Sequence, residues 1–234
     1  MLPLERLAFG VTYQPHYRVR DSLGRIVDDI LYGKNTPFNA ELFPLSEATS
    51  HRHLLRDSDA TNSLGISERD VVLKLTLQSK ETPEVADRAY EFEQHVLATL
   101  QRHAGLESIV RYGMLLEFAE LSGDLQEPLT QHYLRTEATN AVSMHLRFVR
   151  RLPTEEGFAK KGVNDYRNVI YTIVQGDDGK AQISLDYQEY FDPNLSADEA
   201  KKRVFSTFAR DGLTYLDDRG WPWLSGLLKK GAAA

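Results

Sequence analysis

Apolar residues recur at every second position in several stretches of the chain, and this period of two is typical of half-buried β-strands. The alternation is clearest at residues 7–13 and 71–78. On the same basis we predict strands at residues 7–13, 51–57, 61–66, 71–78, 109–121, 142–148, 165–174 and 183–187. Asp177-Asp178-Gly179 separates the last two, which predicts a β-hairpin. The first strand is expected to continue past Pro15, which would place His16, Arg18 and Arg20 on one face.

Other stretches have apolar residues three and four positions apart, and this spacing predicts amphipathic helices. We expect helices at residues 22–33, 82–105, 128–134 and 196–215. Thr82-Pro83 is typical of a helix start, and Gly33 and Gly105 are typical of helix ends. Trp221-Pro222-Trp223 is expected to end the folded part.

The order strand, helix, three strands, long helix occurs twice along the chain. This order predicts an α+β fold of two similar strand-helix-three strands-helix units, with mostly antiparallel sheets covered by long helices. We place the first unit at residues 1–106, the second at 107–226 and a tail at 227–234. The order of elements is similar to that of the TATA-binding-protein-like and helix-grip architectures.

The composition is ordinary for a globular protein, with 234 residues, 41% hydrophobic and 26% charged. The net charge of −6 disfavours non-specific binding to phosphates, but it is compatible with a local basic patch. The chain has no cysteine, which excludes disulfides, thiol catalysis and iron–sulfur clusters. We find neither a signal peptide nor an apolar run of membrane-spanning length, so we expect a cytoplasmic protein without a membrane partner.

Four stretches are distinctive: residues 55–59, 71–100 and 110–115, and the last helix with Phe205, Phe208 and a closing tryptophan. Together they resemble a sporadically distributed, uncharacterised bacterial protein family of about this length. In that family the segment after the long helix has an arginine-tyrosine pair, whereas this chain has Leu115-Leu116 there. The resemblance implies a shared fold and a bacterial origin, and it brings no catalytic residues.

Three histidines form the candidate metal site. His51 and His53 point the same way on a strand, and His16 on the first strand, with Asp57, can complete three or four ligands. Such a site would support a metal-dependent hydrolase, although no HExxH-type signature is present. The carboxylates of Asp186, Glu189 and Asp192 are near one another in sequence and can bind Mg²⁺, but Asp186 and Glu189 fall on opposite faces of a regular strand.

Basic residues with an interleaved aromatic form the candidate binding face. His145 and Arg147 share one face of a predicted strand, Arg150 and Arg151 follow, and Tyr166 opens the neighbouring strand. Such a surface can hold phosphates and stack a base. Arg18 and Arg20 would extend it if the two edges are close, and Trp221 is a candidate interface anchor.

These patterns leave several functions open. The first is a non-catalytic cytosolic binding or adaptor protein with a protein partner and no cofactor, because no reactive constellation stands out. The second is a nucleic-acid-associated protein that uses the basic sheet face. The third is the metal-dependent hydrolase. Pairing of edge strands across a two-fold axis would make the protein a homodimer.

Overall fold

The structure is a computed structural model, and it describes residues 3–38, 42–44, 52–59, 61–79, 81–106, 108–122, 143–153, 166–176, 180–191 and 204–232. Within these residues ten strands form a single antiparallel sheet, and the α+β class predicted from the sequence is confirmed. The strands are β1 (Leu4–Tyr13), β2 (Phe43–Pro44), β3 (Arg52–Arg56), β4 (Ser63–Ser67), β5 (Asp70–Thr76), β6 (Ile109–Phe118), β7 (Leu121–Ser122), β8 (Met144–Pro153), β9 (Tyr166–Gln175) and β10 (Lys180–Tyr190).

Two long helices have the same internal construction. Each begins as an α-helix, passes through a π-helical segment and returns to an α-helix, with no break in the chain. The first comprises α3 (Thr82–Glu91), η2 (Phe92–Leu97) and α4 (Ala98–Ala104), and the second α8 (Phe205–Tyr215), η3 (Leu216–Gly220) and α9 (Trp221–Ala232). Two short helices, α1 (Tyr17–Asp21) and α2 (Leu23–Tyr32), follow β1.

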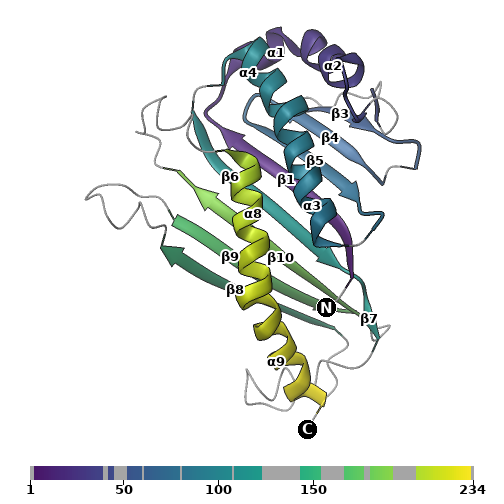
Figure 1. Ribbon diagram of the computed structural model, residues 1–234, viewed down its shortest axis with the longest axis vertical. Helices are drawn as coiled ribbons and strands as arrows, with labels where there is room; N and C mark the ends of the chain where they lie inside the picture. Colours follow the sequence, from purple (N-terminus) through teal and green to yellow (C-terminus); the bar gives the residue numbers. More distant parts are fainter. Residues whose placement is uncertain are drawn as a thin grey trace.

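The strand order is β2-β3-β4-β5-β1-β6-β10-β9-β8, with β7 paired to β10 (Figure 1). The two central strands, β1 and β6, pair antiparallel, and Gly10 lies opposite Gly113. On one side β1 pairs with β5, the last strand before the first long helix. On the other side β6 pairs with β10, the last strand before the second long helix. Outward from the centre, β1-β5-β4-β3 on one side therefore corresponds to β6-β10-β9-β8 on the other, and β2 is added beyond β3.

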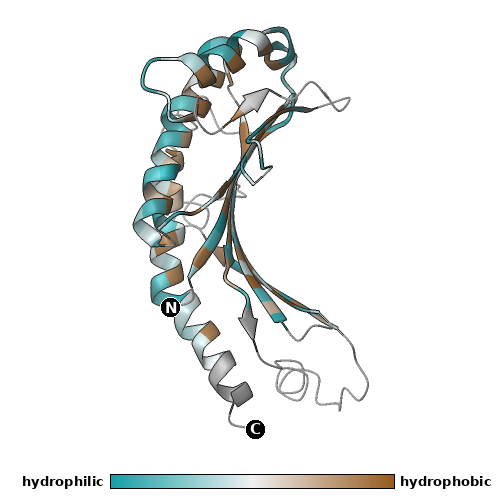
Figure 2. Ribbon diagram, turned by 90° about the vertical axis from the view of Figure 1, so that its right-hand side faces the viewer, coloured by the Kyte–Doolittle hydropathy of each residue, from teal (hydrophilic) through white to brown (hydrophobic). Residues whose placement is uncertain are grey.

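The helices lie along one face of the sheet, and the sheet curves so that its concave face is turned away from them (Figure 2). The strand residues that point toward the helices are apolar and buried, as in β1, where Leu7, Phe9, Val11 and Tyr13 are at most 2% exposed. This period of two gives one contiguous core between sheet and helices. Phe205 of α8 packs edge-on against Phe9 of the sheet.

Two sequence predictions about local structure are wrong. Residues 17–21 form helix α1 instead of continuing the first strand, and only Val19 of this helix is buried. The chain also does not stop folding at Trp221-Pro222-Trp223, because α9 extends through Ala232. The short helix predicted at residues 128–134, the hairpin turn at 177–179 and the start of the last helix at Ser196 lie outside the described residues.

The first long helix ends as the sequence predicts. Gly105 adopts the left-handed conformation, with φ of 68°, and its N–H donates to the carbonyl of Gln101. The start differs slightly, because Glu81 and not Thr82 occupies the N-cap position. The Glu84 carboxylate instead accepts hydrogen bonds from the N–H groups of Gln78 and Ser79, which fixes the turn between β5 and α3.

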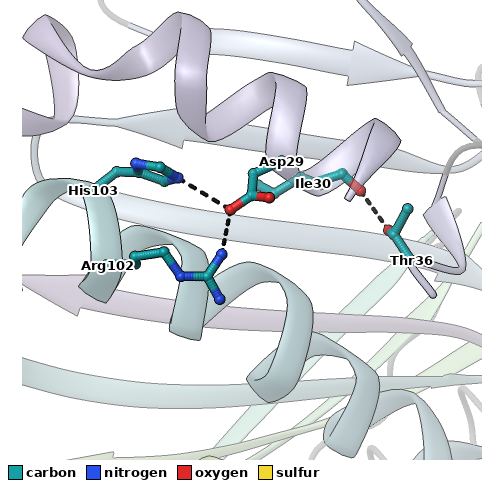
Figure 3. Close-up of polar contacts among 5 residues, drawn as sticks. All are labelled: Asp29, Ile30, Thr36, Arg102 and His103. Carbon is teal, nitrogen blue, oxygen red and sulfur yellow. Dashed lines mark hydrogen bonds and ion pairs between the residues drawn. The ribbon is translucent and has the colours of Figure 1, made fainter. Parts of the chain in front are cut away.

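A polar junction ties α2 to the end of the first long helix (Figure 3). The Asp29 carboxylate contacts both the Arg102 guanidinium and Nε2 of His103, at 2.5 and 3.0 Å. Ser22 donates a hydrogen bond to the carbonyl of His103, and Thr36 donates one to the carbonyl of Ile30. The junction holds the short helices against α4, at one end of the sheet.

Candidate binding face of the sheet

We call the side of the sheet that points away from α3 and α8 the outer face. Side chains alternate along each strand. The pairing register between the strands therefore places one residue of each strand in a row across this face. The central row runs from β3 to β8 through Leu54, Gly65, Val72, Gly10, Gly113, Gln188, Asn168 and Arg151. The row is apolar or without side chains over the first half of the sheet and polar over the second.

Arg151 of this row and three residues of the adjacent row form a stack, which we call the ladder: Arg111, Tyr190, Tyr166 and Arg151. The two tyrosine rings stack with centroids 4.6 Å apart and an angle of 16° between their planes. The Arg151 guanidinium lies over the Tyr166 ring at 4.3 Å, and the Arg111 guanidinium lies over the Tyr190 ring at 5.8 Å. Cation–π contacts of this kind hold a guanidinium in place and leave its N–H groups available as donors.

A chain of hydrogen bonds runs along β10 on the same face. The Tyr190 hydroxyl donates to Oε1 of Gln188 at 2.8 Å, and Nε2 of Gln188 donates to the Asp186 carboxylate. On β9, Asn168 accepts from Nε of Arg151 at 3.4 Å. The amides of Gln188 and Asn168 are therefore oriented by their neighbours.

Asp186 is a carboxylate on a face that is otherwise rich in cations. Burial raises the pKa of the Asp186 carboxyl, while the hydrogen bond from Gln188 and the charges of Arg111 and Arg147 act in the opposite direction. Its row neighbours are Leu115 and Ile170, and Ile170 is buried. The Asp186 carboxyl therefore lies beside apolar side chains, and the charges of Arg111 and Arg147 favour its ionised form.

The raised pKa leads to a prediction about stability. A carboxyl whose pKa is higher in the folded than in the unfolded protein destabilises the fold at pH values above both, and this cost disappears as the pH falls through the folded pKa. We therefore expect Asp186→Asn to raise the melting temperature at pH 7, by a margin that shrinks toward pH 4. Thermal melts of both proteins across this range measure it, and an unchanged margin would contradict it.

The other half of the outer face also carries cations. Arg56 of β3 and Lys74 of β5 lie in one row, with Ser63 between them and Ala8 beyond. The glycines at the centre of the sheet separate these cations from the ladder. A Cβ added at Gly10 or Gly113 would meet no atom closer than 3.8 Å, so packing does not require glycine at either position.

The structure separates the predicted binding residues. His145, Arg147 and Arg151 lie on the outer face, since each pairs with an outer-face residue of β9. Arg150 has the opposite parity and lies on the helix side, where its charge acts on Tyr171. Arg151 is in contact with Tyr166, the aromatic that the sequence placed beside it.

The remaining binding candidates lie elsewhere. Arg18 and Arg20 are on α1, and Arg20 is 3.8 Å from Glu68, so neither extends the basic strand face. Trp221 is 9% exposed and packs against Phe118 on the helix side of the sheet. Trp223 packs against Phe148 and Tyr171 there. Both tryptophans therefore belong to the core between α9 and the sheet.

The candidate metal ligands do not meet within the part of the chain that the structure describes. His16 directs Nε2 to the carbonyl of Gly105 at 3.1 Å, and His53 is exposed on β3. His51 lies outside the described residues, as does Asp192. Asp186 is on the outer face, whereas Glu189 is on the helix side, 3.5 Å from Arg167. No group of three metal-ligating side chains forms among the described residues.

Sequence reasoning missed four residues of the face, namely Arg111, Asn168, Gln188 and Tyr190. Each has the period-two position that would place it on the polar side of its strand. The signal that was lacking is the strand order, because β6 pairs with β10 across about 75 residues of sequence. Alternation assigns a residue to a face but does not say which residues of other strands lie beside it.

Comparison with known proteins gives no functional guide. No protein-family model matches the chain, and no curated protein matches it. None of the described helices combines the length and the apolar character needed to cross a bilayer. The function is therefore argued from the geometry of the outer face.

Proposed function

We propose that this protein is a non-catalytic binding protein, and that its outer face holds single-stranded nucleic acid. The ladder of Arg111, Tyr190, Tyr166 and Arg151 carries this proposal. Guanidinium groups bind phosphate through paired N–H donors, and here two of them are already positioned on aromatic rings. Less side-chain entropy is lost on binding when the donors are held in place beforehand.

The extent of the face supports an elongated ligand. Eight strands, from β3 to β8, cross it, which at a spacing of about 4.8 Å between strands corresponds to about 34 Å. Both halves of this span carry cations, with Arg56 and Lys74 in one half and Arg147 and Arg151 in the other. Between them the glycine pair leaves the backbone accessible, as is common where a ligand approaches closely. A flexible single strand can follow such a curved surface.

The first test removes both ends of the ladder. We expect Arg111→Ala/Arg151→Ala to weaken binding of a fluorescent 20-nucleotide single strand by about tenfold at low salt, since each lost phosphate contact also removes counterion release. The slope of log K against log salt should fall by about 1.4, or roughly 0.7 per arginine. Fluorescence anisotropy titrations at several salt concentrations measure both quantities.

The matched control is Arg210→Ala/Arg219→Ala. These arginines are exposed on α8 and η3, and their removal changes the net charge by the same amount. The control should bind like the unchanged protein. Absence of any complex between the unchanged protein and the oligonucleotide at low salt would refute the proposed function.

A protein partner is the second candidate, in keeping with an adaptor role. Val149 and Val174 are 52% and 41% exposed on the outer face, and the buried Ile170 pairs with Val149, whereas Val174 lies beyond the row of Arg147 and Thr172. The exposed Val149 beside Ile170 offers a small apolar contact area for a protein partner. The partner that can be examined directly is a second copy of the chain, and light scattering of the purified protein tests for a homodimer.

We also propose that the chain arose by internal duplication, with units at residues 1–106 and 107–226 and a tail at 227–234. The mirrored strand order, the Gly10–Gly113 pair at its centre and the π-helical segment in each long helix support this. We retain membership of the uncharacterised bacterial family as a proposal, together with a cytosolic location. The stretches that resemble that family fall on β3, on β5 with the first long helix, on β6 and on α8.

A further inference from the structure

We infer that the outer face reads guanine in its single-stranded ligand, with Asp186 accepting from the Watson–Crick edge and a neighbouring arginine donating to O6. This inference rests on the proposed function and specifies the base that the site selects.

The hydrogen-bond chain on β10 has a defined direction. Tyr190 donates to Gln188, and Gln188 donates to Asp186, so the chain ends on a group that only accepts. One oxygen position is occupied by the Gln188 amide, and the carboxylate has capacity for further donors. Because Gln188 is fixed from both sides, the orientation of the carboxylate is also fixed. The face thus presents an acceptor pair at a set position on β10.

Donors surround this acceptor. Arg111 and Arg147 lie on the same face of the sheet as Asp186, and the charges of both favour its ionised form. Arg111 is held by the Tyr190 ring, and Arg147 stands on β8 in the row of Thr172. A ligand in contact with Asp186 therefore also meets guanidinium N–H donors. The site offers two acceptors beside donors within one small area of the sheet.

Guanine is the base that matches this pattern. Its N1–H and N2–H₂ groups are adjacent donors that a carboxylate can accept together, and its O6 is an acceptor that arginine commonly contacts. Adenine and cytosine place a ring acceptor next to their amino group, and this acceptor would face one of the carboxylate oxygens and repel it. Uracil and thymine offer one donor between two acceptors. Each mismatch sets an acceptor against the carboxylate in place of a second donor, which costs affinity.

The surroundings of Asp186 strengthen the discrimination. Its neighbours in the row are Leu115 of β6 and Ile170 of β9, and Val149 follows on β8. A base lying over these apolar side chains would exclude water from the carboxylate. When water is excluded, a hydrogen bond to a charged group becomes stronger. The loss of affinity for a base that cannot form this bond becomes larger for the same reason.

The experiment uses 12-nucleotide thymine strands that carry one guanine, adenine, cytosine or inosine at the centre. The purified full chain should bind the guanine strand about tenfold more tightly than the adenine strand, as expected for one good paired contact. Inosine keeps N1–H and O6 but lacks the N2 amino group, so it should lose most of this gain. Asp186→Asn should reduce the guanine preference, measured as the ratio of the affinities for the guanine and adenine strands, to within about threefold.

Glu117→Gln is the matched control, because Glu117 is a second acid on the outer face, paired in register with Arg6 and Ser184. It should keep the guanine preference. Binding of all four strands with equal affinity would overturn this inference and leave the proposed function standing. No binding of any strand would instead remove the proposed function itself. A guanine preference that survives in Asp186→Asn would assign the selection to a different residue.

Discussion

Replacing Phe205 with alanine is expected to destabilise the fold by about 3–5 kcal/mol, the range for removing a buried phenylalanine. The ring is 1% exposed and sits where both long helices meet the two central strands. Its centroid is 5.0 to 5.4 Å from the centroids of four other aromatic rings, those of Phe9, Phe92, Tyr112 and Phe208. Alanine would leave a cavity that rigid rings cannot close, and the edge-to-face contacts would be lost as well.

Urea unfolding monitored by circular dichroism measures this effect. The neighbouring Val204 is 40% exposed, so Val204→Ala serves as the control and should change stability by less than about 0.5 kcal/mol. The N–H groups of Phe205 and Ser206 donate to the Glu93 carboxylate, and alanine retains that backbone contact. A loss below 1 kcal/mol in Phe205→Ala would show that the two halves do not share this part of the core.

Much of the fold was readable from the sequence because it depends on local period. The alternation in β1 and β5 matches the observed burial, and Gly105 ends the first long helix in the left-handed conformation expected of a helix-ending glycine. These features require only that each segment bury one face. The α+β class follows from them, since a sheet with one apolar face needs helices to cover it.

Two local predictions failed for reasons that involve neighbours. The residues after Pro15 alternate, yet they form α1, where Val19 is buried at 1% and the helix packs near α4. Five residues are too few for alternation to separate a strand from a helix. Pro222 was expected to end the fold, but it is the second residue of α9, which continues directly from η3. The wider π turn offers room for a ring that lacks an N–H, so the helix continues.

The candidate site was only partly predictable. The basic residues on β8 and the aromatic on β9 were found, because both signals lie within single strands. Treating Arg150 and Arg151 as one group was an error, since adjacent strand residues face opposite sides. Arg111 and Tyr190 complete the ladder only because β6, β10 and β9 are consecutive in the sheet, and that order arises from long-range pairing.

The fold divides its two faces between stability and recognition. The helix side is filled by large apolar residues and tolerates little change. The outer face carries polar and charged groups whose replacement leaves that core intact. Asp186 illustrates the separation, because its ionised form is expected to cost stability while it supplies the acceptor for a ligand. Variants of the outer face should therefore alter binding without unfolding the protein.

Gly212→Ala is expected to destabilise the protein by about 1–3 kcal/mol through overpacking, despite the higher helix propensity of alanine. Gly212 lies on the side of α8 that faces the sheet. Among the described helical glycines, it is the one where an added Cβ would lie closest to a side chain of the sheet. A Cβ there would lie 2.6 Å from Cε of Met114 and 2.8 Å from Cδ1 of Tyr187. The methionine end can move, but Tyr187 is 1% exposed and its ring packs against Phe208, so α8 must shift away from the sheet.

Gly226→Ala is the matched control, because Gly226 is also helical but a Cβ there would meet no atom within 4 Å. It should stabilise the protein by up to about 1 kcal/mol, since alanine loses less backbone entropy than glycine. The two substitutions are chemically identical and are expected to have opposite signs, so the difference isolates the contact between α8 and the sheet. Denaturant unfolding of both variants measures it. Equal stabilisation at the two positions would mean that α8 lies farther from β6 and β10 than the structure places it.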